Sequence, residues 1–128
     1  MEFACRFIVF LIGFGFLAGA FGFIVTPGMM EPDFSIKATQ IDGMGTLRAD
    51  IGGAFAGLAL FTFAGMRRTR AQWLLVPTVF MAAYLVIRLG HLAVDGVTQN
   101  GIRSTVVEIV LLALLYGTHR VLSRGSGR

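Results

Sequence analysis

"FIVFLIGFGFLAGAFGFIVT", residues 7–26, decides the fold class of this chain. It is 20 residues long and carries no charged side chain. As an α-helix it would extend about 30 Å, which matches the hydrocarbon thickness of a bilayer. In lipid every backbone N–H and C=O group must be paired within its own segment, and a helix achieves this. We therefore expect residues 7–26 to form a transmembrane helix.

The same stretch has one feature of a cleaved signal peptide. The small residues Ala18, Gly19 and Ala20 resemble a cleavage site. However, the apolar run continues for six residues past Ala20. We therefore interpret the segment as a retained helix.

The rest of the chain is similarly apolar. Of its 128 residues, 55% are hydrophobic and 14% are charged, whereas about a quarter of the residues in soluble domains are charged. A soluble chain of this size has too little interior to hide so much apolar surface. Three further apolar runs follow at about 46–66, 71–94 and 102–118. We predict an all-α fold, a transmembrane four-helix bundle that forms a single membrane domain over 1–128.

Turn and capping signals separate these runs. Pro27 and Gly28 end the first run. Thr69 and Gln72, in "TRAQ", match a capping box that would open the third helix. "DGVTQNG", residues 95–101, is typical of a turn, and Asn100 is a suitable N-cap for the fourth helix.

The basic residues predict the orientation in the membrane. Seven arginines lie at the chain ends and in the turn between the second and third runs: Arg6, Arg67, Arg68, Arg70, Arg120, Arg124 and Arg128. Only Lys37, Arg48 and Arg103 lie at the opposite side. Because short cytoplasmic loops are enriched in Lys and Arg, we expect both termini to be cytoplasmic.

This orientation puts one longer loop, residues 26–45, on the extracytoplasmic side. Its two prolines and three glycines argue against a long helix. The pattern favours a cap that folds over the helix ends, and a lid over a ligand is the alternative.

Ionisable residues interrupt the third and fourth runs. Arg88, His91 and Asp95 are spaced i, i+3 and i+7, so they share one helix face. Because a charge in hydrocarbon costs at least about 2.5 kcal/mol, Arg88 should pair with Glu108 on the fourth helix. We expect a polar cluster in the outer half of the membrane, composed of Arg48, Asp50, Arg88, His91, Asp95 and Glu108.

Small residues in the second run predict close helix packing. Gly53 and Gly57 have the small-xxx-small spacing that lets transmembrane helices approach, and Gly52 adjoins them.

Several chemistries are excluded or disfavoured. A lone cysteine, Cys5, allows neither an intrachain disulfide nor a Cys-based metal site. His91 and His119 fall at opposite sides of the membrane, which excludes bis-His haem within one chain. Nearby arginines oppose cation binding, so we expect no metal and no cofactor. The basic pI, near 10.2, comes with no nucleic-acid reader motif, so we expect no nucleic-acid partner.

Short motifs also suggest a family. "LRADIGG" (47–53), "RLGHLAVDG" (88–96) and the lone Glu108 resemble a group of small bacterial four-helix integral membrane proteins catalogued as a domain of unknown function. The resemblance implies a four-helix bundle in the bacterial cytoplasmic (inner) membrane. It also implies a polar signature, which here comprises Arg48, Gly52, Gly53, Arg88, Asp95, Gly96 and Glu108. It implies no activity.

Three functional hypotheses remain. The first is a non-catalytic membrane protein, an accessory or self-associating subunit of a membrane assembly, with lipids and other subunits as partners. The second is binding or transport of a small anionic or lipid-like ligand at Arg48, Arg88 and Glu108. The third is a small enzyme that uses His91 as an acid or base. Because no catalytic motif is present, we rank them in that order.

Overall fold

The computed structural model describes residues 1–124, apart from the side chain of Arg68. This part of the chain is helical and contains no β-strand. Four helices in it are long and apolar enough to cross a membrane, Glu2–Val25, Ile41–Ala64, Thr69–Val94 and Gln99–Arg124. The prediction of an all-α fold with four candidate transmembrane helices is therefore confirmed.

All four helices begin before the apolar runs that predicted them, and the fourth also continues past its run, whereas the first and second end one or two residues before theirs. The first is α1 (Glu2–Val25) and the last is α6 (Gln99–Arg124). The second span combines α3 (Ile41–Thr46), a π-helical segment η1 (Leu47–Gly52) and α4 (Gly53–Ala64). The third combines the 3₁₀-helix η2 (Arg68–Leu74) and α5 (Leu75–Val94). Helical hydrogen bonding continues into the polar flanks because it does not depend on hydrophobicity.

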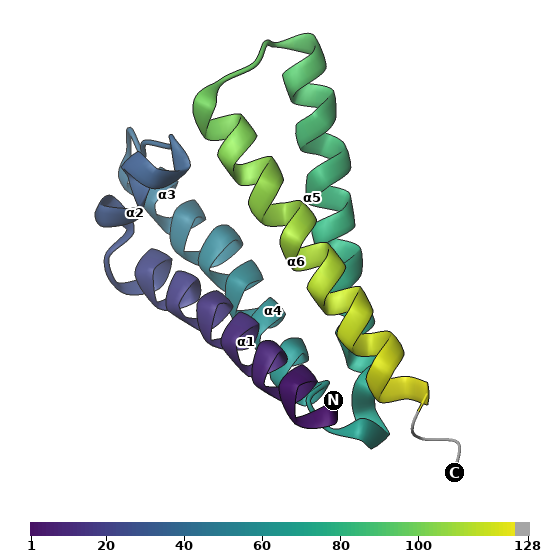
Figure 1. The fold of residues 1–128 in the computed structure, drawn as a ribbon. Coiled ribbons are helices and arrows are strands. Elements are labelled where there is room, and N and C mark those ends of the chain that lie inside the picture. The colour runs from purple at the N-terminus through teal and green to yellow at the C-terminus, as the bar shows by residue number, and fades with distance from the viewer. Residues whose placement is uncertain (125–128) are drawn as a thin grey trace.

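The spans form two helical hairpins (Figure 1). α1 packs mainly on α4, and α5 packs mainly on α6. The start of α1, the η2 turn and the end of α6 lie at one end of the molecule, called here the terminal end. The opposite end carries α2 (Pro27–Phe34), α3 and the α5–α6 loop, and is called the loop end. The two hairpins meet at the terminal end and diverge towards the loop end.

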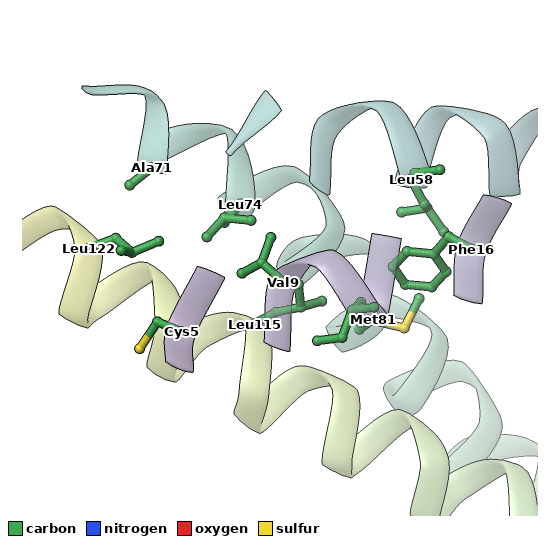
Figure 2. Close-up of a cluster of buried hydrophobic side chains, with 11 residues drawn as sticks. Cys5, Val9, Phe16, Leu58, Ala71, Leu74, Met81, Leu115 and Leu122 are labelled. Carbon is green, nitrogen blue, oxygen red and sulfur yellow. The ribbon is translucent and has the colours of Figure 1, made fainter. Parts of the chain in front are cut away.

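The hydrophobic core joins the hairpins in the half nearer the terminal end (Figure 2). α1, α4, η2, α5 and α6 all contribute buried side chains to it: Cys5, Val9, Ile12, Phe16, Leu58, Ala59, Ala71, Leu74, Met81, Leu115 and Leu122. In α5 the buried residues are Pro77, Thr78 and Met81, all within its first two turns. Beyond them α6 is the main neighbour of α5.

Glycines of α1 set its approach to α4. A Cβ atom at Gly13 would lie 2.8 Å from the Phe63 ring, and one at Gly19 would lie 2.9 Å from the Phe55 ring. The close approach thus depends on glycines that accept phenylalanine rings.

The three glycines predicted to pack differ in their surroundings. A Cβ at Gly52 would lie 2.8 Å from Ile24 Cγ1, so this glycine lies against α1. A Cβ at Gly53 or Gly57 would meet no atom within 4 Å. The small-xxx-small prediction is therefore wrong for Gly53 and Gly57, because the helix turns that pair of residues away from its neighbours.

Buried residues on α6 recur every seven residues. Gly101, Glu108, Leu115 and Leu122 are buried along one stripe of the helix. The facing stripe on α5 contains residues 78, 81, 85, 88 and 92, which are buried or half-buried. This alternation of three and four is the heptad spacing of coiled-coil packing. Arg88 and Glu108 therefore occupy positions in this seam that apolar residues normally fill.

Two predicted helix caps are wrong. The Thr69–Gln72 capping box does not form, because η2 begins at Arg68 and has no side-chain cap. Asn100 lies inside α6, and the Thr98 hydroxyl instead accepts a hydrogen bond from Gly101 N–H, at 3.0 Å. Before it, Gly96 has φ of 110°, a left-handed conformation that favours glycine.

The loop between the first two spans is anchored to its own hairpin. The ring of Phe34, at the end of α2, lies edge-on to Phe23 with the centroids 4.8 Å apart. It also lies edge-on to Phe55, at 6.0 Å. Asn100 Nδ2 donates to Ser35 Oγ, at 3.0 Å, and links this loop to the start of α6. This arrangement supports the interpretation of the loop as a cap.

Candidate functional site

The central feature of the candidate site is an ion pair between α5 and α6. Arg88 Nε donates to Glu108 Oε1 at 2.8 Å. The two residues are 20 positions apart and meet because the helices run antiparallel through a short loop. The pair predicted from the sequence is therefore present. Its location between two helices satisfies the requirement that a charge in lipid finds a partner.

The two members of the pair differ in exposure. The side chain of Glu108 is 9% exposed, whereas that of Arg88 is 35% exposed. Glu108 Oε2 is buried and has no hydrogen-bond partner within the described residues. A buried carboxylate oxygen without a donor is costly. The pair therefore neutralises the charge but leaves part of the hydrogen-bonding capacity unused.

The arginine has unused donors as well. A guanidinium group carries five N–H donors. Within residues 1–124, the recorded bond of Arg88 is the one from Nε to Glu108. Its two terminal nitrogens thus have no recorded protein acceptor and remain able to bind an anionic group.

A shallow pocket of about 330 Å³ lies beside the pair. It is lined by Tyr84, Ile87, Arg88 and His91, all from α5. Tyr84, Arg88 and His91 are spaced i, i+4 and i+7, so they share a helix face. Three side chains with polar groups therefore line a pocket on the outside of the α5–α6 hairpin.

His91 and Asp95 form a second pair, at the end of α5. His91 Nδ1 lies 2.7 Å from Asp95 Oδ2, and because the carboxylate can only accept, the ring nitrogen donates. Their side chains are 54% and 63% exposed. An exposed pair of this kind contributes little to stability.

Arg48 and Asp50 lie on the other hairpin, in η1. Both are exposed. Neither side chain makes a hydrogen bond or ion pair with another described residue. They lie in the π-helical segment, a rare conformation that is frequent at functional sites. The segment begins and ends at buried residues, Leu47 and Gly52, and Gly52 lies against α1.

The six predicted polar residues are therefore divided into three groups. Arg88 pairs with Glu108, His91 pairs with Asp95, and Arg48 and Asp50 remain separate. The expectation that Arg48 and Asp50 would join the Arg88–Glu108 pair is not met, because the hairpins diverge towards the loop end (Figure 1).

Sequence reasoning also missed Tyr84 as a member of the site. Its spacing of four residues from Arg88 was the available signal, but a tyrosine in an apolar run is usually an ordinary packing residue.

The site offers few ligands for a metal. In residues 1–124, no group of three or more His, Cys, Asp and Glu side chains is arranged to hold a metal ion. The candidate site is thus an arginine-centred polar site, suited to anions, hydroxyl groups or polar residues of another helix. Comparison of the chain with family models, curated proteins and solved structures gave no match.

Proposed function

We propose that the protein is a non-catalytic integral membrane subunit that associates with another membrane protein, or with a second copy of itself, through the loop-end half of α5. One observation carries this proposal. Tyr84, Arg88 and His91 form a polar stripe along the edge of the α5–α6 seam, where Tyr84 and His91 are exposed and Arg88 is only partly covered by Glu108.

Without a partner, the polar stripe on α5 would be exposed to lipid. Arg88 lies six residues before the end of α5, about 9 Å along the helix axis. At that depth polar side chains almost always face protein or a water-filled cavity. Glu108 covers only one side of the guanidinium group. A partner helix that brings acceptors to the stripe would remove the cost of exposing it to lipid.

The apolar surroundings of the stripe support the same conclusion. Ile87 is 70% exposed and Val86 is 69% exposed on the same helix. A polar centre with an apolar rim suits helix association in a membrane, where interhelical hydrogen bonds and packing drive contact.

We further infer that the terminal end faces the cytoplasm and that the loop end faces the opposite side. The support is the distribution of arginine, because six arginines of the described residues lie at the terminal end and in its turn: Arg6, Arg67, Arg68, Arg70, Arg120 and Arg124. The resemblance to bacterial membrane proteins favours the bacterial cytoplasmic membrane.

The test is site-directed crosslinking in native membranes. In a Cys5→Ser background, Ile87→Cys is expected to crosslink to a partner, because Ile87 lies beside Arg88. The matched control is Val107→Cys, a residue 50% exposed on α6. A product of twice the chain mass identifies a second copy, and any other mass identifies a different subunit. Equal or absent crosslinking at both positions would contradict the proposal.

A second candidate function is binding of an anionic small molecule at Arg88. The unused terminal nitrogens of this residue and the adjoining pocket of about 330 Å³ favour it. Native mass spectrometry of gently extracted protein tests it. A bound anionic molecule should be absent from Arg88→Gln and retained in Arg103→Gln, which removes the same charge from an exposed position. Retention in both variants would rule out Arg88 as the binding residue.

A further inference from the structure

A second pocket lies at the terminal end, far from the Arg88–Glu108 pair. Its volume is about 500 Å³, and it is lined by Arg6, Phe63, Met66, Arg67 and Thr69. Arg6 belongs to α1, Phe63 to α4, and the other three residues to the α4–η2 connection and η2. Segments more than 50 residues apart in the sequence thus meet around one pocket.

The lining combines two kinds of surface. Arg6, Arg67 and Thr69 are exposed, and none of their side chains has a recorded hydrogen bond or ion pair with another described side chain. Phe63 and Met66 are half-buried and pack against the hydrophobic core. The pocket therefore offers two guanidinium groups and a hydroxyl group beside an apolar wall.

With α1 and the second span across a bilayer, the pocket falls at the depth of lipid phosphate groups. Arg6 directly precedes the uncharged run that begins at Phe7. Arg67 follows the end of the second span, Ala64, by three residues. Both arginines are thus at the boundary between hydrocarbon and water. An apolar wall there would contact the first part of an acyl chain, and the arginines would lie level with the headgroup.

We propose that this pocket binds the phosphate group of an anionic phospholipid. Arginine binds phosphate through parallel N–H donors, which gives both strength and geometry. Basic pockets between transmembrane helices are known sites for anionic headgroups. A zwitterionic lipid would bring its own cation close to two guanidinium groups, and this repulsion selects against it. The proposal does not depend on the association through α5.

The experiment is lipid retention by the full chain in detergent. The protein is equilibrated with an equimolar mixture of phosphatidylglycerol and phosphatidylcholine of equal chain length, and bound lipid is counted by native mass spectrometry. We expect preferential retention of phosphatidylglycerol. The Arg6→Gln/Arg67→Gln variant should lose at least about tenfold in affinity, because charge-assisted hydrogen bonds are lost. Arg6→Lys/Arg67→Lys should lose less, since it keeps the charge but not the paired donors.

Two control variants separate specific binding from a general charge effect. Arg124→Gln removes a charge from an exposed residue at the same end, and Arg103→Gln removes one near the loop end. Both should retain phosphatidylglycerol as the native protein does. Arg6 and Arg67 are exposed, so their replacement should not disturb the core, and the fluorescence of Trp73 provides the check of folding.

Three results would overturn the proposal. The first is equal retention of the two lipids by the native protein. The second is an equal loss of phosphatidylglycerol in Arg124→Gln and in the Arg6→Gln/Arg67→Gln variant. The third is full displacement of phosphatidylglycerol by an equimolar amount of inorganic phosphate, which would identify a site for a soluble anion instead.

Discussion

The two halves of the molecule treat buried polar groups differently. In the half nearer the terminal end, the hydroxyl groups of Thr62, Thr78 and Thr118 are buried, and each donates to a carbonyl four residues earlier, at 2.6–2.7 Å. In the half nearer the loop end, Arg88 and Glu108 are paired, yet Glu108 Oε2 has no partner among residues 1–124. The first arrangement is complete within single helices. The Arg88–Glu108 pair needs two helices, and it leaves Glu108 Oε2 without a hydrogen-bond donor in the described part of the chain.

The two halves also differ in how their helices pack. The cluster of core residues lies where both hairpins meet, and the divergent part contains one hairpin seam only (Figures 1 and 2). Stability is therefore concentrated near the terminal end. The proposed association surface lies on α5 near the loop end. Four predictions test this contrast.

The largest effect is expected when the ion pair is broken. Arg88→Leu leaves the Glu108 carboxylate buried without a cation, and removal of one member of a buried pair costs about 4 kcal/mol. We expect this loss in the free energy of unfolding, measured by titration with denaturing detergent and followed by fluorescence of Trp73, the only tryptophan.

The Arg88→Leu/Glu108→Leu variant is the matched control. Because it leaves no unpaired charge in the seam, it should recover most of the lost stability. If the losses from the two single substitutions simply add in the double variant, the pair does not stabilise the seam.

A comparison of two leucines in the same seam should give the next largest effect. Leu115 is fully buried, and Leu115→Ala should cost about 3 kcal/mol because it leaves a cavity. Leu92 is half-buried near the loop end, and Leu92→Ala should cost about 1 kcal/mol. The same unfolding titration measures both. Equal losses would show that the loop-end half is packed as tightly as the terminal half.

The cap of α6 should have a smaller effect. Thr98→Ala removes the hydroxyl that accepts from Gly101 N–H, and loss of such a cap costs about 1 kcal/mol. Asn100→Ala removes only an exposed bond to Ser35 and should cost about 0.5 kcal/mol. Hydrogen exchange of the first turn of α6 reports these changes locally. A larger effect for Asn100→Ala would mean that the contact between the two loops, rather than the cap, holds this turn.

The smallest effect on stability is expected at the exposed pair. His91→Ala should change the free energy of unfolding by less than about 0.5 kcal/mol, because exposed ion pairs contribute little. If α5 is the association face, the same variant should reduce the yield of crosslinking at residue 87 while the free energy of unfolding stays nearly unchanged. Unchanged crosslinking would exclude His91 from the contact.

Much of the architecture was predictable from local sequence. The uncharged run from Phe7 to Thr26 and the three later runs were sufficient to predict the four spans, because bilayer thickness sets helix length. The Arg88–Glu108 pair was predictable since the two residues lie at similar distances from a short turn. The heptad spacing of Gly101, Glu108, Leu115 and Leu122 was also present in the sequence, and it would have placed Glu108 in the α5–α6 seam.

Other features required the folded structure. Arg48 and Asp50 were expected at the Arg88–Glu108 pair because they lie at a similar depth in the membrane. Depth comes from sequence position, but distance within the plane of the membrane depends on how the hairpins diverge. Gly53 and Gly57 are a similar case. Their spacing suits helix packing, but the tertiary arrangement of the helices leaves them facing open space.

The sequence alone determined that the chain forms four helices long and apolar enough to span a membrane, which of its residues carry charge within them, and where each charge lies along its helix. Hydrogen bonding within each helix and the thickness of the bilayer are sufficient for these properties. Only the tertiary structure decided which helix faces meet, where the hairpins separate, and which donors and acceptors remain unused. The physical reason is that lipid solvates an apolar helix face as well as another helix does, so hydrophobicity does not specify the partner of each face.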